Sequence, residues 1–128
     1  MEVIRSSEAH LEDIVRLNEV VQKVHCEHEQ SHFRTYDPDV VREHIQHAFA
    51  DAAVIFLVAL EEGVPLGYVL LRKRERPEDA FSKARTYLEL EHIAVSPEAR
   101  RRGVGSALID ETFVLAKALS IPDVELSV

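Results

Sequence analysis

Apolar residues recur along this chain with two periods, one typical of helices and one typical of strands. Helical spacing predicts three helices, which begin after Ser7, after Asp37 and near Gly103, the last running to about Leu119. Ser7 and Asp37 can each cap a helix N-terminus, and Pro38 suits a first helical turn. Runs rich in β-branched residues predict strands at residues 3–5, 53–60, 65–72, 86–95 and 124–128. The order β-α-α-β-β-β-α-β predicts one mixed α/β domain over residues 1–128.

The central strands carry local signals of their own. The segment Glu61-Glu62-Gly63 predicts a hairpin between the second and third strands, and Gly67 is expected to mark a bulge in the third strand. The polar stretch 73–84 is expected to be a loop. These signals predict that the second to fourth strands follow one another across the sheet.

The pattern of the fourth strand changes partway along it. Leu88 and Leu90 alternate with glutamates, but Ile93 and Val95 fall on the glutamates' parity. One extra residue near His92 would restore the buried face, so we expect a β-bulge there. Plain alternation would point His92 away from the glutamates, and a bulge weakens that expectation.

Charge and composition exclude several classes of function. The chain has 128 residues, 15 Lys and Arg against 23 Asp and Glu, and a net charge of −8, which argues against general nucleic-acid binding. The longest apolar run, residues 52–60, is too short to span a membrane, and no secretion signal is visible. Cys26 is the single cysteine, so we expect no intramolecular disulfide and a cytoplasmic location. Residues 72–102 nevertheless carry nine basic residues against six acids, which favours an anionic ligand in that region.

The segment joining the fourth strand to the third helix has the features of an anion site. Gly103 and Gly105 allow close approach of the backbone at a helix N-terminus, where unpaired N–H groups favour negative charge. Three arginines, Arg100, Arg101 and Arg102, come immediately before it. A dinucleotide fingerprint would need glycine at Leu108, and the Lys-Ser or Lys-Thr of a Walker loop is absent.

These residues resemble the acyl-CoA loop of the GNAT acetyltransferase superfamily, whose pattern is Arg or Gln, two residues, Gly, one residue, then Gly or Ala. Arg100, Gly103 and Gly105 fill that pattern. Ile93–Pro97 looks like the family's preceding strand, and Pro65–Val69 resembles its hairpin. The resemblance implies a mostly antiparallel twisted sheet with flanking helices, and acetyl-CoA as cosubstrate without a metal.

The same resemblance implies two groups of cofactor-binding residues. The pyrophosphate would lie on the loop formed by Arg100, Arg101, Arg102, Gly103, Val104, Gly105 and Ser106. The pantetheine arm would pair with the backbone of the strand residues Ile93, Ala94 and Val95. A bulge at the strand would also aim a backbone N–H toward the thioester carbonyl.

The implied reaction is direct attack of a primary amine on acetyl-CoA, which requires a base. Glu89 and Glu91 are the candidates, and some family members carry a glutamate four residues before the position of Ile93, which favours Glu89. A solvated carboxylate pair without a catalytic role is the alternative reading. The excess of acids elsewhere favours a cationic acceptor amine.

Residues 25–36 allow two interpretations. His25, His28 and His32 have the spacing of one helix face and, with Glu29, suit a transition metal, although polar His-rich surfaces are common. The resemblance instead implies that the connection between the first two helices contacts the acceptor through His32, Phe33, Arg34 and Tyr36. We expect the latter, with no metal, and a structural role for the Cys26 thiol.

Two broader expectations concern the end of the chain and the class of function. The family's usual helix and strands after the last strand are not in this sequence, so we expect either a truncated chain or a homodimer that covers the open sheet edge. The alternative to an enzyme is a non-catalytic GNAT-like module that binds acyl-CoA or a partner.

Overall fold

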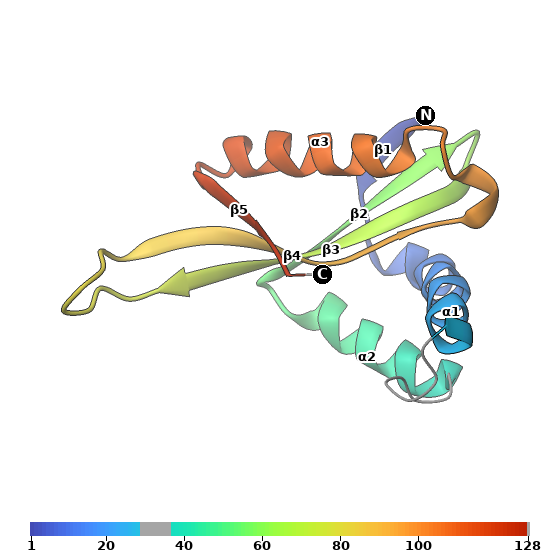
Figure 1. Ribbon diagram of the computed structural model, residues 1–128, viewed down its shortest axis with the longest axis horizontal. Coiled ribbons are helices and arrows are strands. Elements are labelled where there is room, and N and C mark those ends of the chain that lie inside the picture. The colour runs from blue at the N-terminus through green and yellow to red at the C-terminus, as the bar shows by residue number, and fades with distance from the viewer. Residues whose placement is uncertain (29–36, 128) are drawn as a thin grey trace.

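The computed structural model describes residues 1–28 and 37–127, which form one mixed sheet with helices on both faces (Figure 1). The strands are β1 (Glu2–Arg5), β2 (Val54–Glu61), β3 (Val64–Arg76), β4 (Arg85–Val95) and β5 (Asp123–Leu126), and the helices are α1 (Leu11–His28), α2 (Pro38–Ala50) and α3 (Val104–Ala118). The strands lie in the order β1-β2-β3-β4-β5, antiparallel except for the parallel pair β4–β5. The predicted fold class and element order are confirmed.

Side-chain caps account for where the first two helices begin. The Ser7 hydroxyl accepts a hydrogen bond from the Ala9 amide at 3.3 Å and starts a short 3-10 turn that leads into α1. The Asp37 carboxylate accepts from the amide of Asp39 at 3.0 Å, and Pro38 is the first residue of α2. These contacts satisfy amide groups that a helix N-terminus leaves unpaired.

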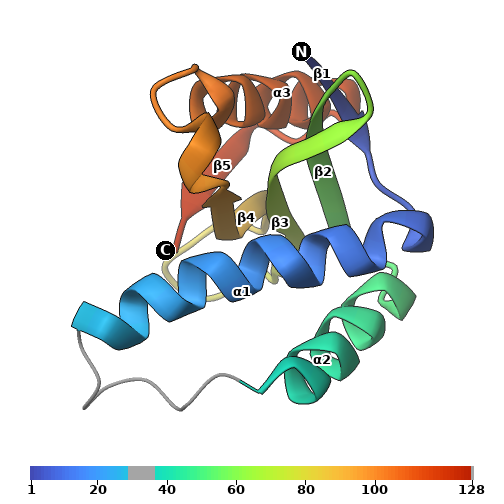
Figure 2. The same ribbon diagram turned by 90° about the vertical axis from the view of Figure 1, so that its right-hand side faces the viewer.

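Figure 2 shows α3 on one face of the sheet and α1 and α2 on the other. Successive strand residues point to opposite faces, so the sheet separates two apolar clusters. On the face covered by α1 and α2, the buried residues include Ile14, Ile45, Phe56, Val58, Tyr68 and Leu70. On the face covered by α3, they include Leu57, Val69, Leu71, Leu88, Leu90 and Leu108. The first six residues of β2 are all buried, as expected for a strand covered on both faces.

The expected bulge in β4 is present. Leu70 pairs with His92, but the next residue, Leu71, pairs with Leu90, so Glu91 is the extra residue. Ile93 therefore returns to the α3 face, where it packs against the same cluster as Leu90. His92 comes to the opposite face, the glutamates' face, and its ring stacks on His44 of α2 with centroids 6.4 Å apart. Plain alternation is wrong for His92, which it would point to the α3 face. The insertion of Glu91 turns His92 to the α1/α2 face instead.

Gly67 positions β3 against the start of α3. The register between β2 and β3 shifts beside it, since Ala59 pairs with Gly67 and Leu60 pairs with Pro65. A Cβ at Gly67 would lie 2.8 Å from the Ala94 carbonyl oxygen and 3.1 Å from a Val104 methyl carbon. Only glycine allows the two strands and the first turn of α3 to approach this closely.

The third and fourth strands extend further than the sequence predicts. The sequence pattern predicts a loop over 73–84, but β3 continues to Arg76 and β4 begins at Arg85, so the connecting loop is 77–84. This two-stranded arm projects beyond the other elements (Figure 1). Both of its faces are mainly polar and exposed, so it lacks the apolar alternation that identifies a half-buried strand.

Candidate active site

The paired strands β4 and β5 separate partway along β4. They pair from Tyr87 with Asp123 to Leu90 with Leu126, and the Ser127 amide donates to the Leu90 carbonyl at 3.1 Å. In the part of the chain that the structure describes, the remainder of β4 through Val95 pairs with β3 alone. This segment contains the predicted residues Ile93, Ala94 and Val95. Its free side can hydrogen-bond an extended chain that carries amide groups.

The loop between β4 and α3 ends at a helix N-terminus without a side-chain cap. The turn Pro97–Ala99 follows β4, and the Arg102 amide donates to the Ala99 carbonyl at 3.3 Å. Gly103 then occupies the N-cap with a left-handed φ of 79°, and it has no side chain to bond the first amides. The first intrahelical donor is the amide of Ala107, 3.0 Å from the Gly103 carbonyl.

The amides of Val104, Gly105 and Ser106 precede that donor, so the helix itself does not use them. We call these three amides the α3 cradle. With the positive end of the helix dipole behind them, they can bind a phosphate group.

Gly105 leaves space beside the α3 cradle. A Cβ built there would lie 4.0 Å from one Val95 methyl carbon and would meet nothing else closer. Packing within the protein therefore does not require glycine at this position. At Gly103 the space is also open, but the positive φ itself favours glycine. The open space at Gly105 fits a bound group that approaches the backbone closely.

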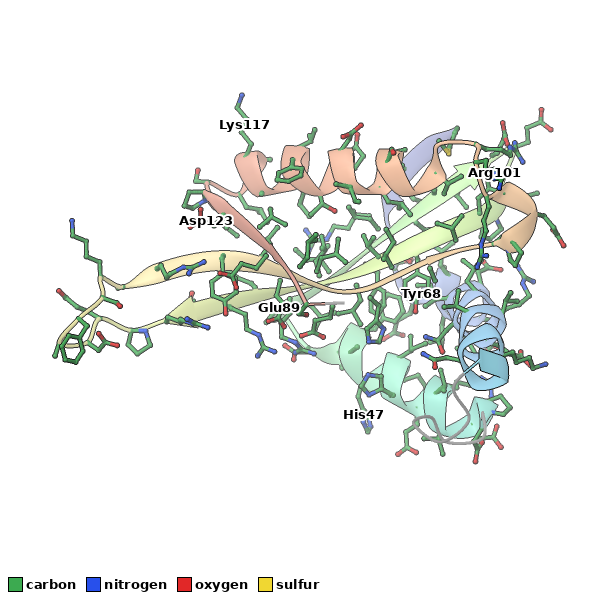
Figure 3. The ribbon with its side chains drawn as sticks, viewed as in Figure 1. His47, Tyr68, Glu89, Arg101, Lys117 and Asp123 are labelled. Atoms are coloured by element: carbon green, nitrogen blue, oxygen red, sulfur yellow. The ribbon has the colours of Figure 1, made fainter. Side chains whose placement is uncertain are left out.

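The three arginines before the cradle have different surroundings. Arg102 forms an ion pair with Glu61 at the end of β2, which ties the loop to the β2–β3 hairpin. Arg100 and Arg101 are exposed and, among the described residues, have no acidic partner. Figure 3 shows Arg101 in this loop, at the end of the sheet near α1. Arg100 and Arg101 are therefore free to pair with an anion.

The two glutamates of β4 lie within a chain of charged groups on the α1/α2 face. Arg74 contacts the carboxylates of Glu89 and Glu91 at 3.2 and 3.1 Å, and Arg72 donates to Glu91 at 2.7 Å. Arg72 also contacts Asp51, just after α2, at 2.9 Å. The structure thus brings the two predicted carboxylates together, beside two arginines that sequence reasoning misses. A signal for them exists, since Arg72 and Arg74 share one parity on the neighbouring strand.

The surroundings of Glu91 and His92 shift their pKa values. Burial alone would raise the pKa of Glu91, but the hydrogen bond from Arg72 and the charges of Arg72 and Arg74 bring it below its ordinary value. Burial lowers the pKa of His92, and the neighbouring His44 lowers it further. At neutral pH Glu91 is a charged carboxylate held by arginine, and His92 is a neutral imidazole.

Several predicted residues lie outside the described part of the structure. These are the acceptor-contact residues His32, Phe33, Arg34 and Tyr36, and with them Glu29 and the side chains of His25, Cys26 and His28. Among the described residues, no group of three or more histidine, cysteine or acidic side chains could hold a metal ion. None of the described helices is long and apolar enough to cross a membrane.

Comparison with known proteins supports the resemblance. The model of the acetyltransferase (GNAT) family matches residues 18–128, whereas no curated protein matches the sequence. The BH1408 protein from Bacillus halodurans, solved as a tetramutant, superposes with a TM-score of 0.90 at 19% identity, over 100% of this chain and 83% of its own.

Two acetyltransferases superpose less closely. The ribosomal-protein-alanine N-acetyltransferase from Brucella melitensis biovar Abortus 2308 has a TM-score of 0.74 at 20% identity, over 100% of this chain and 80% of its own. The aminoglycoside N-acetyltransferase AAC(6')-Iy, in complex with CoA, has a TM-score of 0.73 at 17% identity, over 99% and 76%. With a family model that spans most of its length and a fold shared with these structures, the chain belongs to the GNAT acetyltransferase family.

Proposed function

We propose that this protein is an acetyl-CoA-dependent N-acetyltransferase that acts on a primary amine. The observation that carries the proposal is the α3 cradle, an uncapped helix N-terminus with open space at Gly105. Arg100 and Arg101 lie before it, and neither has an acidic partner in the part of the chain that the structure describes. These groups would bind the pyrophosphate of acetyl-CoA through backbone amides and guanidinium groups. The free side of β4 at Ile93, Ala94 and Val95 would then pair with the pantetheine arm. Family membership and a neighbour solved with CoA support this assignment.

Glu89 is the better of the two candidate bases. Glu91 is held by both Arg72 and Arg74, whereas the one ion-pair partner of Glu89 among the described residues is Arg74, whose side chain is 46% exposed. Replacement of the Arg74 contact by water therefore costs less free energy at Glu89 than loss of both arginine contacts would cost at Glu91. We propose that it accepts the proton that the acceptor ammonium loses, through a bound water molecule.

The proposed reaction balances without a further reactant. The acceptor ammonium loses one proton to Glu89 through water, and its neutral nitrogen then forms the new N–C bond with the acetyl carbonyl carbon. As the C–S bond of the thioester breaks, the nitrogen loses a second proton and the departing thiolate takes up one. The products are the acetylated amine, the CoA thiol and one proton, which Glu89 returns to solvent.

A cationic amine is the acceptor that the charge distribution favours. The chain carries a net charge of −8, with its excess of basic residues confined to the segment 72–102. One structural neighbour is an aminoglycoside acetyltransferase and another acts on ribosomal protein, so the shared fold serves both small and protein amines. We propose that residues 32–36 contribute to the acceptor site, as the family resemblance implies.

Calorimetric titration with CoA, followed by turnover of a panel of cationic small-molecule and peptide amines, tests the proposal. We expect saturable binding of CoA and release of CoA thiol with at least one amine. Arg74 contacts both carboxylates, and this favours the alternative that the protein binds acyl-CoA without transferring it. Tight CoA binding with no turnover of any amine would support that alternative, and absence of binding would contradict both.

A further inference from the structure

The β3–β4 arm presents an unpartnered aromatic side chain at its tip. Phe81 is 97% exposed, and its backbone lies in a tight turn. The Asp79 carboxylate accepts hydrogen bonds from the amides of Phe81 and Ser82 at 2.8 and 2.7 Å, and the Asp79 amide donates to the Ser82 carbonyl at 3.0 Å. The turn is therefore ordered around a side chain that contacts almost nothing. Exposure of a whole phenylalanine has a hydrophobic cost, which burial against a partner removes.

An apolar groove lies at the same end of the molecule. It occupies about 350 Å³ between the last turns of α3 and the start of β5, and its lining includes Phe113, Ile121, Pro122 and Val124. Phe113 is itself 56% exposed, and Val114, Leu119 and Leu126, which belong to α3, its C-terminal end and β5, are also exposed. We call this feature the α3–β5 groove. Grouped exposed apolar residues of this kind mark contact surfaces more often than scattered ones do.

The charges of the tip and of the groove are complementary. The tip loop, residues 77–84, carries Glu78 and Asp79 against Lys83, and the groove lining carries Lys117. Among the described residues, neither Glu78 nor Lys117 has an ion-pair partner. An acidic tip placed in a groove that holds a free lysine gains one ion pair in addition to the buried Phe81.

The tip cannot reach the groove of its own chain. The arm projects away from α3 and β5 (Figure 1), although Arg85 at its base contacts Glu125 of β5 at 2.6 Å. Tip and groove therefore lie at one end of the molecule but apart. A twofold axis between the tip and the groove places the tip of each copy at the groove of the other. Both tip-in-groove contacts then form at once, and the bodies of the two copies lie on opposite sides of the axis.

From these observations we infer that the chain forms a twofold homodimer by arm exchange, with Phe81 of each copy inserted into the α3–β5 groove of the other. Glu78 then faces the partner's Lys117. Two small loop-in-groove contacts are at the low end of interface size, so we expect micromolar association. The inference concerns the arm and the groove alone and does not depend on acetyl transfer.

Analytical ultracentrifugation of the full chain across micromolar concentrations tests the inference. We expect a monomer–dimer equilibrium whose dissociation constant rises about 100-fold or more in Phe81→Ser, because each dimer loses two buried phenylalanines. Thermal unfolding of the monomer, measured well below the dissociation constant, should not change, since Phe81 is 97% exposed and lies outside the core. Val40→Ser removes another exposed apolar side chain, from α2 and not from the arm, and should leave the dissociation constant unchanged.

A charge exchange identifies the contact itself. Glu78→Lys and Lys117→Glu should each weaken the dimer, and the double variant should restore it. A monomer at every concentration overturns the inference. So does a dimer that Phe81→Ser leaves intact, since that result would place the contact elsewhere, for example at the open edge of β5. Failure of the double variant to recover association would contradict the proposed Glu78–Lys117 pairing.

Discussion

The α3 cradle leads to a sharp test at Gly105, where the protein itself does not require glycine. Gly105→Ala adds one carbon atom, 4.0 Å from the nearest Val95 methyl carbon, and it keeps the Gly-or-Ala pattern of the family. Gly105→Val adds two further methyl groups, whose rotation is restricted in a helix. Both substitutions favour the helix, alanine by up to about 1 kcal/mol and valine by less. Neither variant should therefore lose stability.

Binding of CoA should separate the two variants. The branched side chain of Gly105→Val would occupy the space beside the amides that we propose bind the pyrophosphate. Loss of one hydrogen bond to a charged group costs about 1.5–3 kcal/mol, which corresponds to a dissociation constant about 10- to 100-fold higher. Gly105→Ala should bind CoA within about threefold of the unmodified protein, since less than about 1 kcal/mol is at stake.

Calorimetric titration with CoA measures the affinity, and thermal unfolding without ligand measures the stability. If both variants bind CoA equally well, the first turn of α3 does not hold the pyrophosphate, and the assignment of the cradle is wrong. If Gly105→Val instead unfolds several degrees earlier, the valine side chain meets protein atoms, and the space beside Gly105 is not reserved for a ligand.

Three other predictions concern the base, the glycines with positive φ, and His92. Glu89→Gln should lower kcat strongly at neutral pH and leave CoA affinity unchanged. Glu91→Gln should mainly lower the free energy of unfolding, by about 1–3 kcal/mol, because it breaks half-buried ion pairs. Steady-state kinetics and chemical denaturation distinguish the two effects, and the reverse pattern would refute the choice of Glu89 as base. Gly103→Ala and Gly63→Ala both put a Cβ into open space at a φ of 79°, so each should cost about 1 kcal/mol, but only the former should weaken CoA binding. Since the pKa of His92 is lower in the folded protein, the unfolded chain takes up its proton first, and stability should fall as the pH drops below about 6.5. Replacing His92 with Gln should flatten that fall in denaturation series, and an unchanged slope would mean that His92 is not the group responsible.

Local signals in the sequence predict the parts of the fold that local chemistry determines. Asp37 caps α2 through its side chain, and Glu62 and Gly63 take positive φ values of 49° and 79° in the hairpin turn. The arm from residue 73 to residue 85 escapes prediction for a physical reason. Its strands are stabilised by pairing with each other, with solvent on both sides, so no buried face leaves a period in the sequence.

The surroundings of the candidate site depend on contacts between strands, which local patterns do not contain. Arg72 and Arg74 lie 15 to 19 positions from the glutamates that they contact, and the β3–β4 register decides which arginine meets which carboxylate. His44 comes from a separate helix, α2, and meets His92 only through the tertiary fold, with ring centroids 6.4 Å apart. The residue types at the site could thus be predicted, but not their pairing or their pKa values.

The bulge at Glu91 connects the core to the candidate site. The parity of β4 requires one inserted residue, since without it Ile93 and Val95 would leave the α3 cluster for the opposite face. A bulge also bends its strand and increases the local twist. Pairing with β5 ends at Leu90, the residue immediately before the insertion, so the bulge lies where β4 and β5 separate. Glu91 keeps the parity of Glu89, and the insertion places His92 on the same α1/α2 face as the two carboxylates. The burial of two apolar residues thereby requires a bulge at the point where β4 gains the free edge that we propose pairs with a pantetheine arm, and that bulge puts His92 beside the carboxylates.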